Sequence, residues 1–305
     1  MHTKKITFKQ FWELSEIYTA PLNLFIILLG ISAANFLAHT ELSRNLTVFI
    51  SIILSFHIAV NVFNNWKDFE NAEDEGYKTA TNIIGRDNLS ITTVKVIFYL
   101  AMAVSLILGT YLVSQTNLLV GILGFIGFYI GLFYSYGKYP INSLPIAETV
   151  TAIASGFFIT TIAYYLATLK EPHQTTNFFL SLGAISLPLV ISMFNNLLAN
   201  NTCDLEEDIQ NGRKTLVYYL GKEKAVNLLL GLTIFNFVWL IPLVILGLAP
   251  KLILALLLAL PFVLKKLRFY KVEQDKQKTF PIVLKSMSLM MVTYPVLYFI
   301  GSYLS

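Results

Sequence analysis

Charged residues and cysteine are both scarce in this chain. Only 13% of its 305 residues are Asp, Glu, Lys or Arg, whereas a soluble domain carries about 25%. An ordinary soluble globular domain is therefore excluded. The one cysteine, Cys203, excludes an intrachain disulfide and a cysteine-based metal cage.

The positions of the charged residues argue against a nucleic-acid partner and against a cleavable signal peptide. The formal net charge is +4, but the basic residues occupy loops between apolar runs, so we expect no nucleic-acid partner. Residues 1–16 are polar and charged, and the first apolar run continues as a membrane span. A cleavable signal peptide is therefore not expected.

Long apolar runs make up most of the sequence, which is 55% hydrophobic with a mean hydropathy of +0.64. A transmembrane helix needs about 20 mostly apolar residues. The sequence therefore predicts an all-α, polytopic membrane protein in a lipid bilayer. We expect about nine transmembrane helices, at Ala20–Ala38, Asn45–Trp66, Ile91–Val113, Leu118–Tyr136, Pro145–Leu169, Asn177–Asn200, Ala225–Gly247, Leu252–Leu264 and Val283–Leu304. The eighth is short and contains Pro261, which predicts a kink or a re-entrant segment.

The basic residues also predict an orientation. Most of the 22 Lys and Arg residues fall on one side of these spans, and only Arg44, Lys170 and Lys251 fall on the other. Because cytoplasmic loops are enriched in Lys and Arg, we expect the N-terminus and the longer loops to be cytoplasmic.

Two similar polar motifs follow the second and sixth predicted spans, at this cytoplasmic side. The sequences are NNWKDFENAED and NNTCDLEED, and each places an Asp after an Asn-Asn pair and then a further Asp. Carboxylates beside hydrocarbon are costly and are functional by default. The spacing of four helices between the motifs predicts a repeat, with halves at about 20–140 and 145–268 of a single domain spanning 1–305. Such halves would face one another across a central cavity.

Residues four apart share a helix face, so these motifs present oxygen ligands together. Oxygen ligands without His or Cys suit Mg²⁺, which is usually held by one or two carboxylates and substrate phosphates. The predicted metal ligands are Asn64, Asp68, Asp74, Asn200, Asp204 and Asp208. The alternative is that they are solvated loop acids. That alternative is the favoured interpretation for Glu70, Glu73, Glu75, Glu206 and Glu207.

Other polar residues near the motifs are candidates for contacting an anionic substrate. Arginine offers a bidentate fork to phosphate groups, although positive charge at these loops also serves topology. The candidate substrate-binding residues are Arg86, Arg213, Lys214, Lys138, Asn61 and Asn201, and Tyr134 is a candidate catalytic residue with Asp68 and Asp204. Two of these have structural alternatives: Asn61 as a polar contact between helices, and Tyr134 as an interfacial anchor. For His57, a hydrogen-bonded structural role is favoured over proton transfer.

The chain resembles the UbiA superfamily of intramembrane prenyltransferases, and within it the 1,4-dihydroxy-2-naphthoate branch. The second motif continues into NGRKTL, which resembles the family's G-R-x-T-L through Gly212, Arg213, Thr215 and Leu216. The long gap from Asp68 to Asp74 and the later IIGRDN segment resemble the naphthoate branch, and YGKYPINSLPIAE resembles a proline-rich family segment. The chain departs at Tyr18, near the usual place of a basic residue, and at Cys203, where arginine is frequent.

This resemblance implies a mechanism, a cofactor and a location. Mg²⁺ held by both motifs would bind a polyprenyl diphosphate, whose ionisation gives an allylic carbocation. The ring of 1,4-dihydroxy-2-naphthoate would attack this cation and lose CO₂, giving a demethylmenaquinone. The expected location is a bacterial inner membrane, with the active site at its cytoplasmic face.

Other functions stay open at this stage. Other acceptors in the superfamily include hydroxybenzoate, haem, a chlorophyll precursor and a lipid glycerol, and the gap before Asp74 argues against the first. A cation or metabolite transporter is the alternative of a different class. Transporters place their acidic residues near the bilayer midplane, often at broken helices, whereas both motifs here lie at helix ends. A scaffold has no feature in its favour.

Overall fold

A computed structural model describes residues 6–38, 43–72, 75–168 and 177–304, in which all regular structure is helical. The chain divides into two compact units, Met1–Asn23 with Arg44–Asn142, and Leu24–Ser43 with Ser143–Ser305. The first polar motif lies in the first unit and the second motif in the second unit. The predicted single domain and its repeat halves stay predictions.

The first unit is built around one long helix that carries the first motif. α3 packs along α5, and α6 returns beside α5 after the short turn at 115–117. The helices of this unit are α1 (Phe8–Leu14), α3 (Arg44–Asn71), α4 (Ile83–Arg86), α5 (Ile91–Ser114) and α6 (Leu118–Phe133), with a π-helical turn at Tyr77–Thr81.

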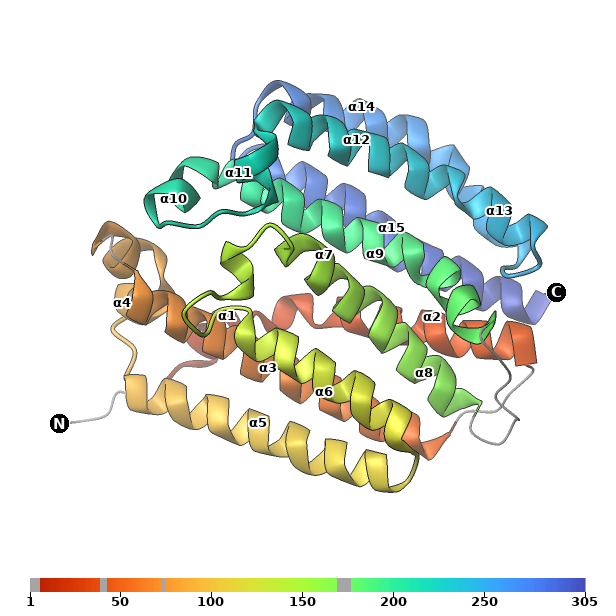
Figure 1. The fold of residues 1–305 in the computed structure, drawn as a ribbon, viewed down its shortest axis with the longest axis horizontal. Coiled ribbons are helices and arrows are strands. Elements are labelled where there is room, and N and C mark those ends of the chain that lie inside the picture. The colour runs from red at the N-terminus through yellow and green to blue at the C-terminus, as the bar shows by residue number, and fades with distance from the viewer. Residues whose placement is uncertain (1–5, 39–42, 73–74, 169–176, 305) are drawn as a thin grey trace. The chain divides into compact units, whose positions relative to one another are not determined.

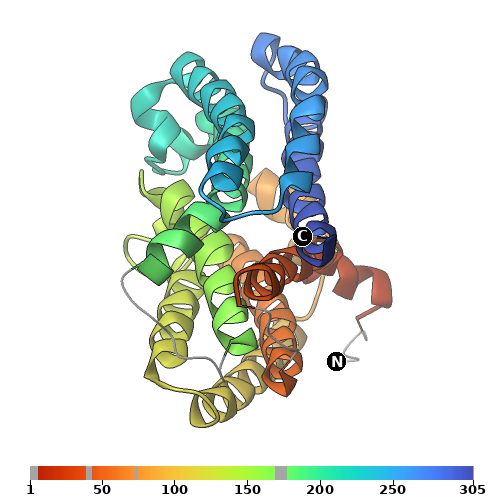
Figure 2. The same cartoon turned by 90° about the vertical axis from the view of Figure 1, so that its right-hand side faces the viewer.

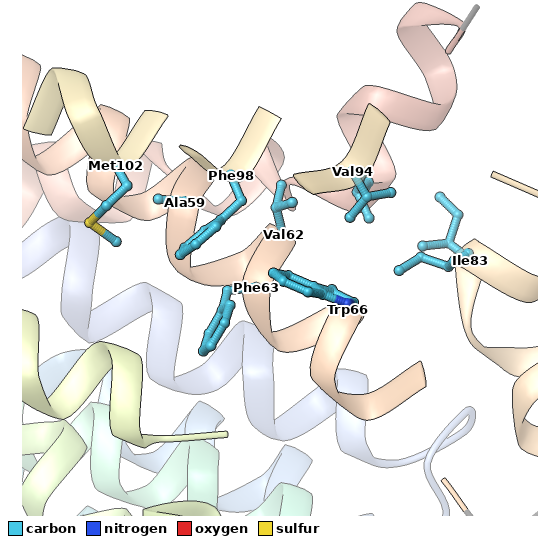
Figure 3. Packing of buried hydrophobic residues seen from close by; sticks show 10 residues of the cluster. Ala59, Val62, Phe63, Trp66, Ile83, Val94, Phe98 and Met102 are labelled. Carbon is cyan, nitrogen blue, oxygen red and sulfur yellow. The ribbon is translucent and has the colours of Figure 1, made fainter. Parts of the chain in front are cut away.

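An aromatic core anchors the end of α3 (Figure 3). Phe63 stacks on Phe98 of α5 with ring centroids 4.8 Å apart, and Trp66 meets the same ring edge-on at 6.0 Å. Both side chains of α3 are buried. Because Asn64 and Asp68 stand at other angles around the helix, this packing sets the direction in which the motif projects.

The second unit surrounds α9, which carries the second motif. α9 packs against α7, α12 and α15. Figure 1 shows α15 along α9 and α14 along α12, and Figure 2 shows the blue helices of the C-terminal part from the end. The helices are α2 (Pro21–Ala38), α7 (Ala147–Ala152), α8 (Ile159–Ala167), α9 (Asn177–Cys203), α10 (Leu205–Gln210), α11 (Leu216–Leu220), α12 (Lys222–Val238), α13 (Leu240–Ile245), α14 (Leu260–Val272) and α15 (Phe280–Leu304). A π-helical stretch, Ile153–Phe158, joins α7 to α8, and a 3-10 helix, Lys251–Ala259, precedes α14.

Pro188 lies inside α9 and removes one of its backbone hydrogen bonds. Proline has no N–H, so the carbonyl four residues earlier loses its partner. The indole of Trp239, between α12 and α13, donates to that carbonyl, Ala184 O, at 3.0 Å. Asn236 of α12 donates to Pro188 O at 3.1 Å and to Ser192 at 3.0 Å. Trp239, directly after α12, therefore supplies the donor that Ala184 O needs in an apolar medium, and Asn236 adds a second contact between α12 and α9.

Gly156 brings the π-helical stretch into close contact with α9. A Cβ at this position would lie 2.7 Å from Val190 Cγ2 and 2.9 Å from Val190 N. Small residues allow transmembrane helices to approach closely, so this glycine sets the separation between the two segments.

The structure confirms an all-α membrane architecture and refines the spans. Seven helices within the described ranges are long and apolar enough to cross a membrane. The segment predicted at Leu118–Tyr136 forms the shorter helix α6, with 16 residues. The segment predicted at Leu252–Leu264 is divided between the 3-10 helix and α14, with the change beside Pro261. The count of nine and the cytoplasmic N-terminus stay predictions.

We predict that Gly156→Ala lowers the melting temperature of the purified protein in detergent. The added methyl group meets the backbone of α9, and overpacking of this kind costs about 1–3 kcal/mol. Gly231→Ala in α12 is the matched control, because a Cβ there meets nothing within 4 Å. The control gains helix propensity of up to about 1 kcal/mol. Equal melting temperatures for the two variants would contradict the close contact.

Candidate functional site

The first motif occupies the last turns of α3, beyond its apolar part. Asn64 is half-buried, and its side-chain oxygen Oδ1 has no hydrogen-bond partner among the described residues. Asn65 points elsewhere and donates to Leu14 O at 3.2 Å and to Asn61 O at 3.1 Å. The Asn-Asn pair therefore divides its roles: Asn65 secures α1 to α3, and Asn64 keeps an oxygen available.

Glu16 is a neighbour of this motif that sequence analysis missed. It adopts the left-handed conformation, with φ of 47°, which is unusual for a residue other than glycine. Burial raises the pKa of Glu16, and the negative charge of Asp68 raises this pKa further. The loop before α2 thus holds a second carboxyl group near Asp68. No sequence pattern marked it.

Asn61 lies one turn earlier on α3 and contacts His57. Its side-chain nitrogen donates to His57 O at 2.9 Å and lies 3.1 Å from the ring atom Nε2. The His57 ring also contacts Thr19, Asn23 and Glu16 O at 3.2–3.3 Å. The favoured structural role of His57 agrees with these hydrogen bonds, and Asn61 belongs to the same polar cluster.

Glu70 is held by neighbours on its own helix. Its two oxygens accept from Trp66 Nε1 at 2.6 Å and from Lys67 Nζ at 2.7 Å. Glu70 is therefore an exposed acid paired near the end of α3, and its interpretation as a solvated loop acid stays a prediction.

Arg86 ties α4 to α1. Its Nη2 lies 2.8 Å from Glu13 Oε1 and its Nε lies 3.0 Å from Asp87 Oδ1. Asp87 in turn accepts from Gln10 at 3.2 Å. The hydrogen bond from Arg86 lowers the pKa of Asp87. The guanidinium thus lies at the surface of the unit that carries the first motif. Its positive charge is already matched by the carboxylates of Glu13 and Asp87.

At the end of α9, the second motif contains a carboxylate paired with a lysine from a distant loop. Asn200 Nδ2 donates to Asp204 Oδ2 at 3.1 Å. The ammonium of Lys276 donates to Asn200 Oδ1 at 2.5 Å and forms an ion pair with Asp204 Oδ2. A cation therefore bridges the two oxygens that the sequence predicts as metal ligands.

Asp208 is the buried acid of the second motif, with 5% of its surface exposed. Burial raises its pKa to about 6, and the charge of Arg213 works in the opposite direction. Arg213 Nη1 lies 3.6 Å from Oδ1, while Oδ2 has no hydrogen-bond partner among the described residues. A buried carboxylate oxygen without a partner is costly.

Gly212 explains why Arg213 lies beside Asp208. It has a φ of 70°, a conformation that glycine adopts without strain. The turn closes α10 with hydrogen bonds from Gly212 N to Ile209 O at 3.1 Å and from Arg213 N to Asp208 O at 2.8 Å. The Gly-Arg order in the sequence therefore returns the arginine to Asp208, the acid five positions earlier.

Glu148 braces the second motif from α7. It is fully buried and accepts from Asn201 Nδ2 at 2.8 Å through Oε1. Just before α7, Ser143 O accepts from Lys214 N at 3.0 Å. The segment 143–148 thus contacts the motif on both sides of Asp204 and Asp208. The sequence placed Glu148 within a family-like segment but did not single it out as a site residue.

The remaining predicted residues occupy surface positions. Tyr134 ends α6, is half-buried, and its carbonyl accepts from Asn142 N at 2.9 Å. The Lys138 ammonium is exposed and lies 5.3 Å from the Tyr139 ring. The Lys214 ammonium lies 5.8 Å from the Tyr218 ring. Asp74 lies outside the described residues.

The donor chemistry of both motifs fits Mg²⁺. The residues offer amide and carboxylate oxygens, and Asn64 Oδ1 and Asp208 Oδ2 are buried without hydrogen-bond partners in the described part of the chain. No group of three or more His, Cys, Asp or Glu residues able to hold a metal is found within that part. Mg²⁺ takes one or two protein carboxylates and completes its shell with water and phosphate, so the amide and carboxylate oxygens of each motif suit it.

Known proteins resemble this chain in both sequence and fold. The model of the UbiA prenyltransferase family matches residues 23–290. A 1,4-dihydroxy-2-naphthoate octaprenyltransferase from Bacillus subtilis (strain 168) is 29% identical over 255 residues, which cover 82% of this chain and 78% of the relative.

Solved structures give the same picture for the fold. The apo structure of a UbiA homologue from Aeropyrum pernix K1 matches with a TM-score of 0.67 at 12% identity, covering 94% of this chain and 98% of the other. A UbiA homologue from Archaeoglobus fulgidus, bound to GPP and Mg²⁺, matches with a TM-score of 0.59 at 12% identity, covering 96% and 99%. The chain therefore belongs to the UbiA prenyltransferase family, as a multi-pass membrane enzyme that transfers prenyl groups.

Proposed function

We propose that this enzyme transfers a polyprenyl group from a polyprenyl diphosphate to 1,4-dihydroxy-2-naphthoate in a Mg²⁺-dependent reaction. The C–O bond to diphosphate breaks first and gives an allylic carbocation, to which the ring carbon that bears the carboxylate then forms the new C–C bond. The carboxylate then leaves as CO₂, and its bonding electron pair restores the aromatic ring. The product is the hydroquinone form of a demethylmenaquinone, and diphosphate is the second product.

The observation that carries this proposal is the junction of α9 and α10. Asn200 and Asp204 present oxygens at the end of α9, and the buried Asp208 follows in α10 with Arg213 beside it. Carboxylates and an arginine together suit a metal diphosphate, because each matches a different part of its charge. The Bacillus subtilis relative supports naphthoate as the acceptor, because its own name states that activity.

Within this proposal the residues have separate roles. Bound Mg²⁺ would neutralise the diphosphate and so favour its departure. The proposed metal ligands are Asn64, Asp68, Asp74, Asn200, Asp204 and Asp208. The proposed diphosphate contacts are Arg86, Arg213, Lys214 and Lys138, with Asn61 and Asn201 contacting substrate and Tyr134 bordering the carbocation.

The membrane context follows from the same chemistry. A polyprenyl chain is as apolar as the lipid around the spans, so it remains in the bilayer while its diphosphate stays in water. Both motifs follow apolar helices, and the excess of Lys and Arg in the nearby loops supports a cytoplasmic position for each motif under the proposed topology. We propose a bacterial inner membrane as the location.

Replacing Asp204 or Asp68 by Asn should lower kcat/KM at least about 100-fold, because loss of a metal ligand exceeds the 10- to 100-fold effect of its outer partners. The assay supplies polyprenyl diphosphate and 1,4-dihydroxy-2-naphthoate with Mg²⁺ or EDTA and detects products by mass spectrometry. Glu206→Gln is the control, because Glu206 is an exposed acid of the same segment paired with Lys222 at 2.7 Å. Retained activity in Asp204→Asn, or an equal loss in Glu206→Gln, would contradict the assignment.

The same assay tests the acceptor. The expected product has gained the prenyl group and lost CO₂, and it forms only with Mg²⁺. Prenylation of another aromatic or lipid acceptor, with none of naphthoate, would retain the family activity and reject the acceptor. The absence of both product and diphosphate release would reject the proposed reaction.

Glu148 should act by orienting Asn201, so its replacement by Ala should lower kcat/KM about tenfold or more. Glu148→Gln keeps an oxygen that accepts from Asn201 and should stay within about threefold of the wild type. Asn201→Ala should resemble Glu148→Ala, and the double variant should lose little more than either, because residues in contact are not additive. Additive losses, or a melting temperature that falls in parallel with activity, would indicate a structural role alone.

A further inference from the structure

Lys276 is a charged residue at the second motif that the predicted catalytic set does not include. Its side chain is 45% exposed, and that of Asp204 is 25% exposed. The ammonium contacts Asn200 and Asp204 together, across 72 positions of sequence from Asp204. A single positive group therefore lies where the predicted ligand oxygens converge.

The loop that carries Lys276 is held in one conformation by its own hydrogen bonds. Asp275 Oδ1 accepts from the backbone N–H groups of Gln277 at 2.9 Å and Lys278 at 2.7 Å. The Thr279 hydroxyl accepts from Asp275 N at 2.9 Å and donates to Glu273 O at 2.8 Å. Lys276 lies within this hydrogen-bonded turn between α14 and α15. The backbone of the turn therefore sets the point from which the lysine side chain extends.

Lys278 of the same turn provides an internal contrast. Its ammonium lies 3.2 Å from Glu273 and 3.9 Å from Asp275, both within the loop, and its side chain is 69% exposed. Two lysines only two positions apart thus have different partners. Lys276 alone of the pair contacts the motif.

We propose that Lys276 is the resident counter-cation of Asn200 and Asp204, and that it sets the affinity of this half of the site for a divalent cation. The inference rests on the proposed metal-binding role of these two residues. A divalent cation and the ammonium compete for the same oxygens, so binding of one displaces the other. In the metal-free protein the lysine neutralises Asp204 and keeps the pair aligned.

The consequence is that Lys276 lowers the affinity of Asn200 and Asp204 for a free divalent cation. Like charges repel, and a competitor tethered to the protein cannot be diluted away. The enzyme therefore binds a metal alone weakly at this motif. A metal that arrives with a diphosphate brings negative charge, which the displaced ammonium can neutralise, so the lysine favours the metal–diphosphate pair over the free metal.

The test measures Mn²⁺ binding to purified full-length protein in detergent by electron paramagnetic resonance, without prenyl substrate. Lys276→Met should bind Mn²⁺ about fivefold more tightly than the wild type, the change that corresponds to a partly exposed ion pair of ~1 kcal/mol. Lys278→Met is the matched control, with the same charge change in the same loop, and should leave the affinity unchanged. Lys276→Arg retains the charge and should remain near the wild type.

Inorganic diphosphate gives a second measurement. With saturating Mn²⁺, Lys276→Met should bind diphosphate more weakly than the wild type, whereas Lys278→Met should not. The inference is overturned if Lys276→Met binds Mn²⁺ no more tightly than the wild type, or if Lys278→Met shows the same gain.

Asp204→Asn separates this inference from the proposed function. If Asp204→Asn weakens Mn²⁺ binding while Lys276→Met leaves it unchanged, only the role of Lys276 fails. If Asp204→Asn binds Mn²⁺ as well as the wild type, the metal assignment fails and the role of Lys276 fails with it.

Discussion

The constraint on which this structure depends is that a polar group beside hydrocarbon must have a partner. Water cannot satisfy such a group inside a bilayer, so an unpaired donor, acceptor or charge is expensive there. The helix ends that carry the two motifs show how the chain meets this constraint. Glu148 pairs with Asn201, and Lys276 pairs with Asp204. Nine buried side-chain oxygens have no hydrogen-bond partner in the described residues, and those of Asn64, Asp208 and Glu148 Oε2 lie at or beside the two motifs.

The same constraint explains why neighbouring residues of one motif have different roles. Asn65 uses its side chain to join α1 to α3, and Glu70 is held by Trp66 and Lys67. These contacts satisfy the side chains of Asn65 and Glu70. Asn64 Oδ1, by contrast, has no hydrogen-bond partner among the described residues. A motif at the end of a membrane helix is thus part structural support and part chemistry, and the hydrogen bonds distinguish the two parts.

Local sequence was sufficient for most of the helical architecture, because an apolar run of about 20 residues in a bilayer has few alternatives to a helix. The seven long spans were all predicted this way. It also located both motifs, since polar residues at the ends of such runs stand out. The 3-10 helix at Lys251–Ala259 was not predicted, because a continuous apolar stretch does not reveal which helical hydrogen-bond pattern it adopts. The roles proposed for the motif residues are not tested by the fold.

What sequence analysis could not find are the contacts made across long separations. Lys276 was counted only as a basic residue that favours the cytoplasmic side, because nothing within its own loop indicates Asp204 as its partner. Glu16 precedes the first span and has no local pattern, yet it lies near enough to Asp68 for their charges to interact. Such pairings depend on how distant helices pack, and one sequence does not carry that information.

The interrupted helix α9 has a mechanical consequence. Its carbonyls near Pro188 are satisfied by Trp239 and Asn236, which lie on or beside α12. Sliding α9 past α12 would remove the Trp239 donor from Ala184 O in an apolar medium, whereas Pro188 O would keep the Ser192 hydroxyl of its own helix. One proline in α9 therefore favours a single register of this helix against α12.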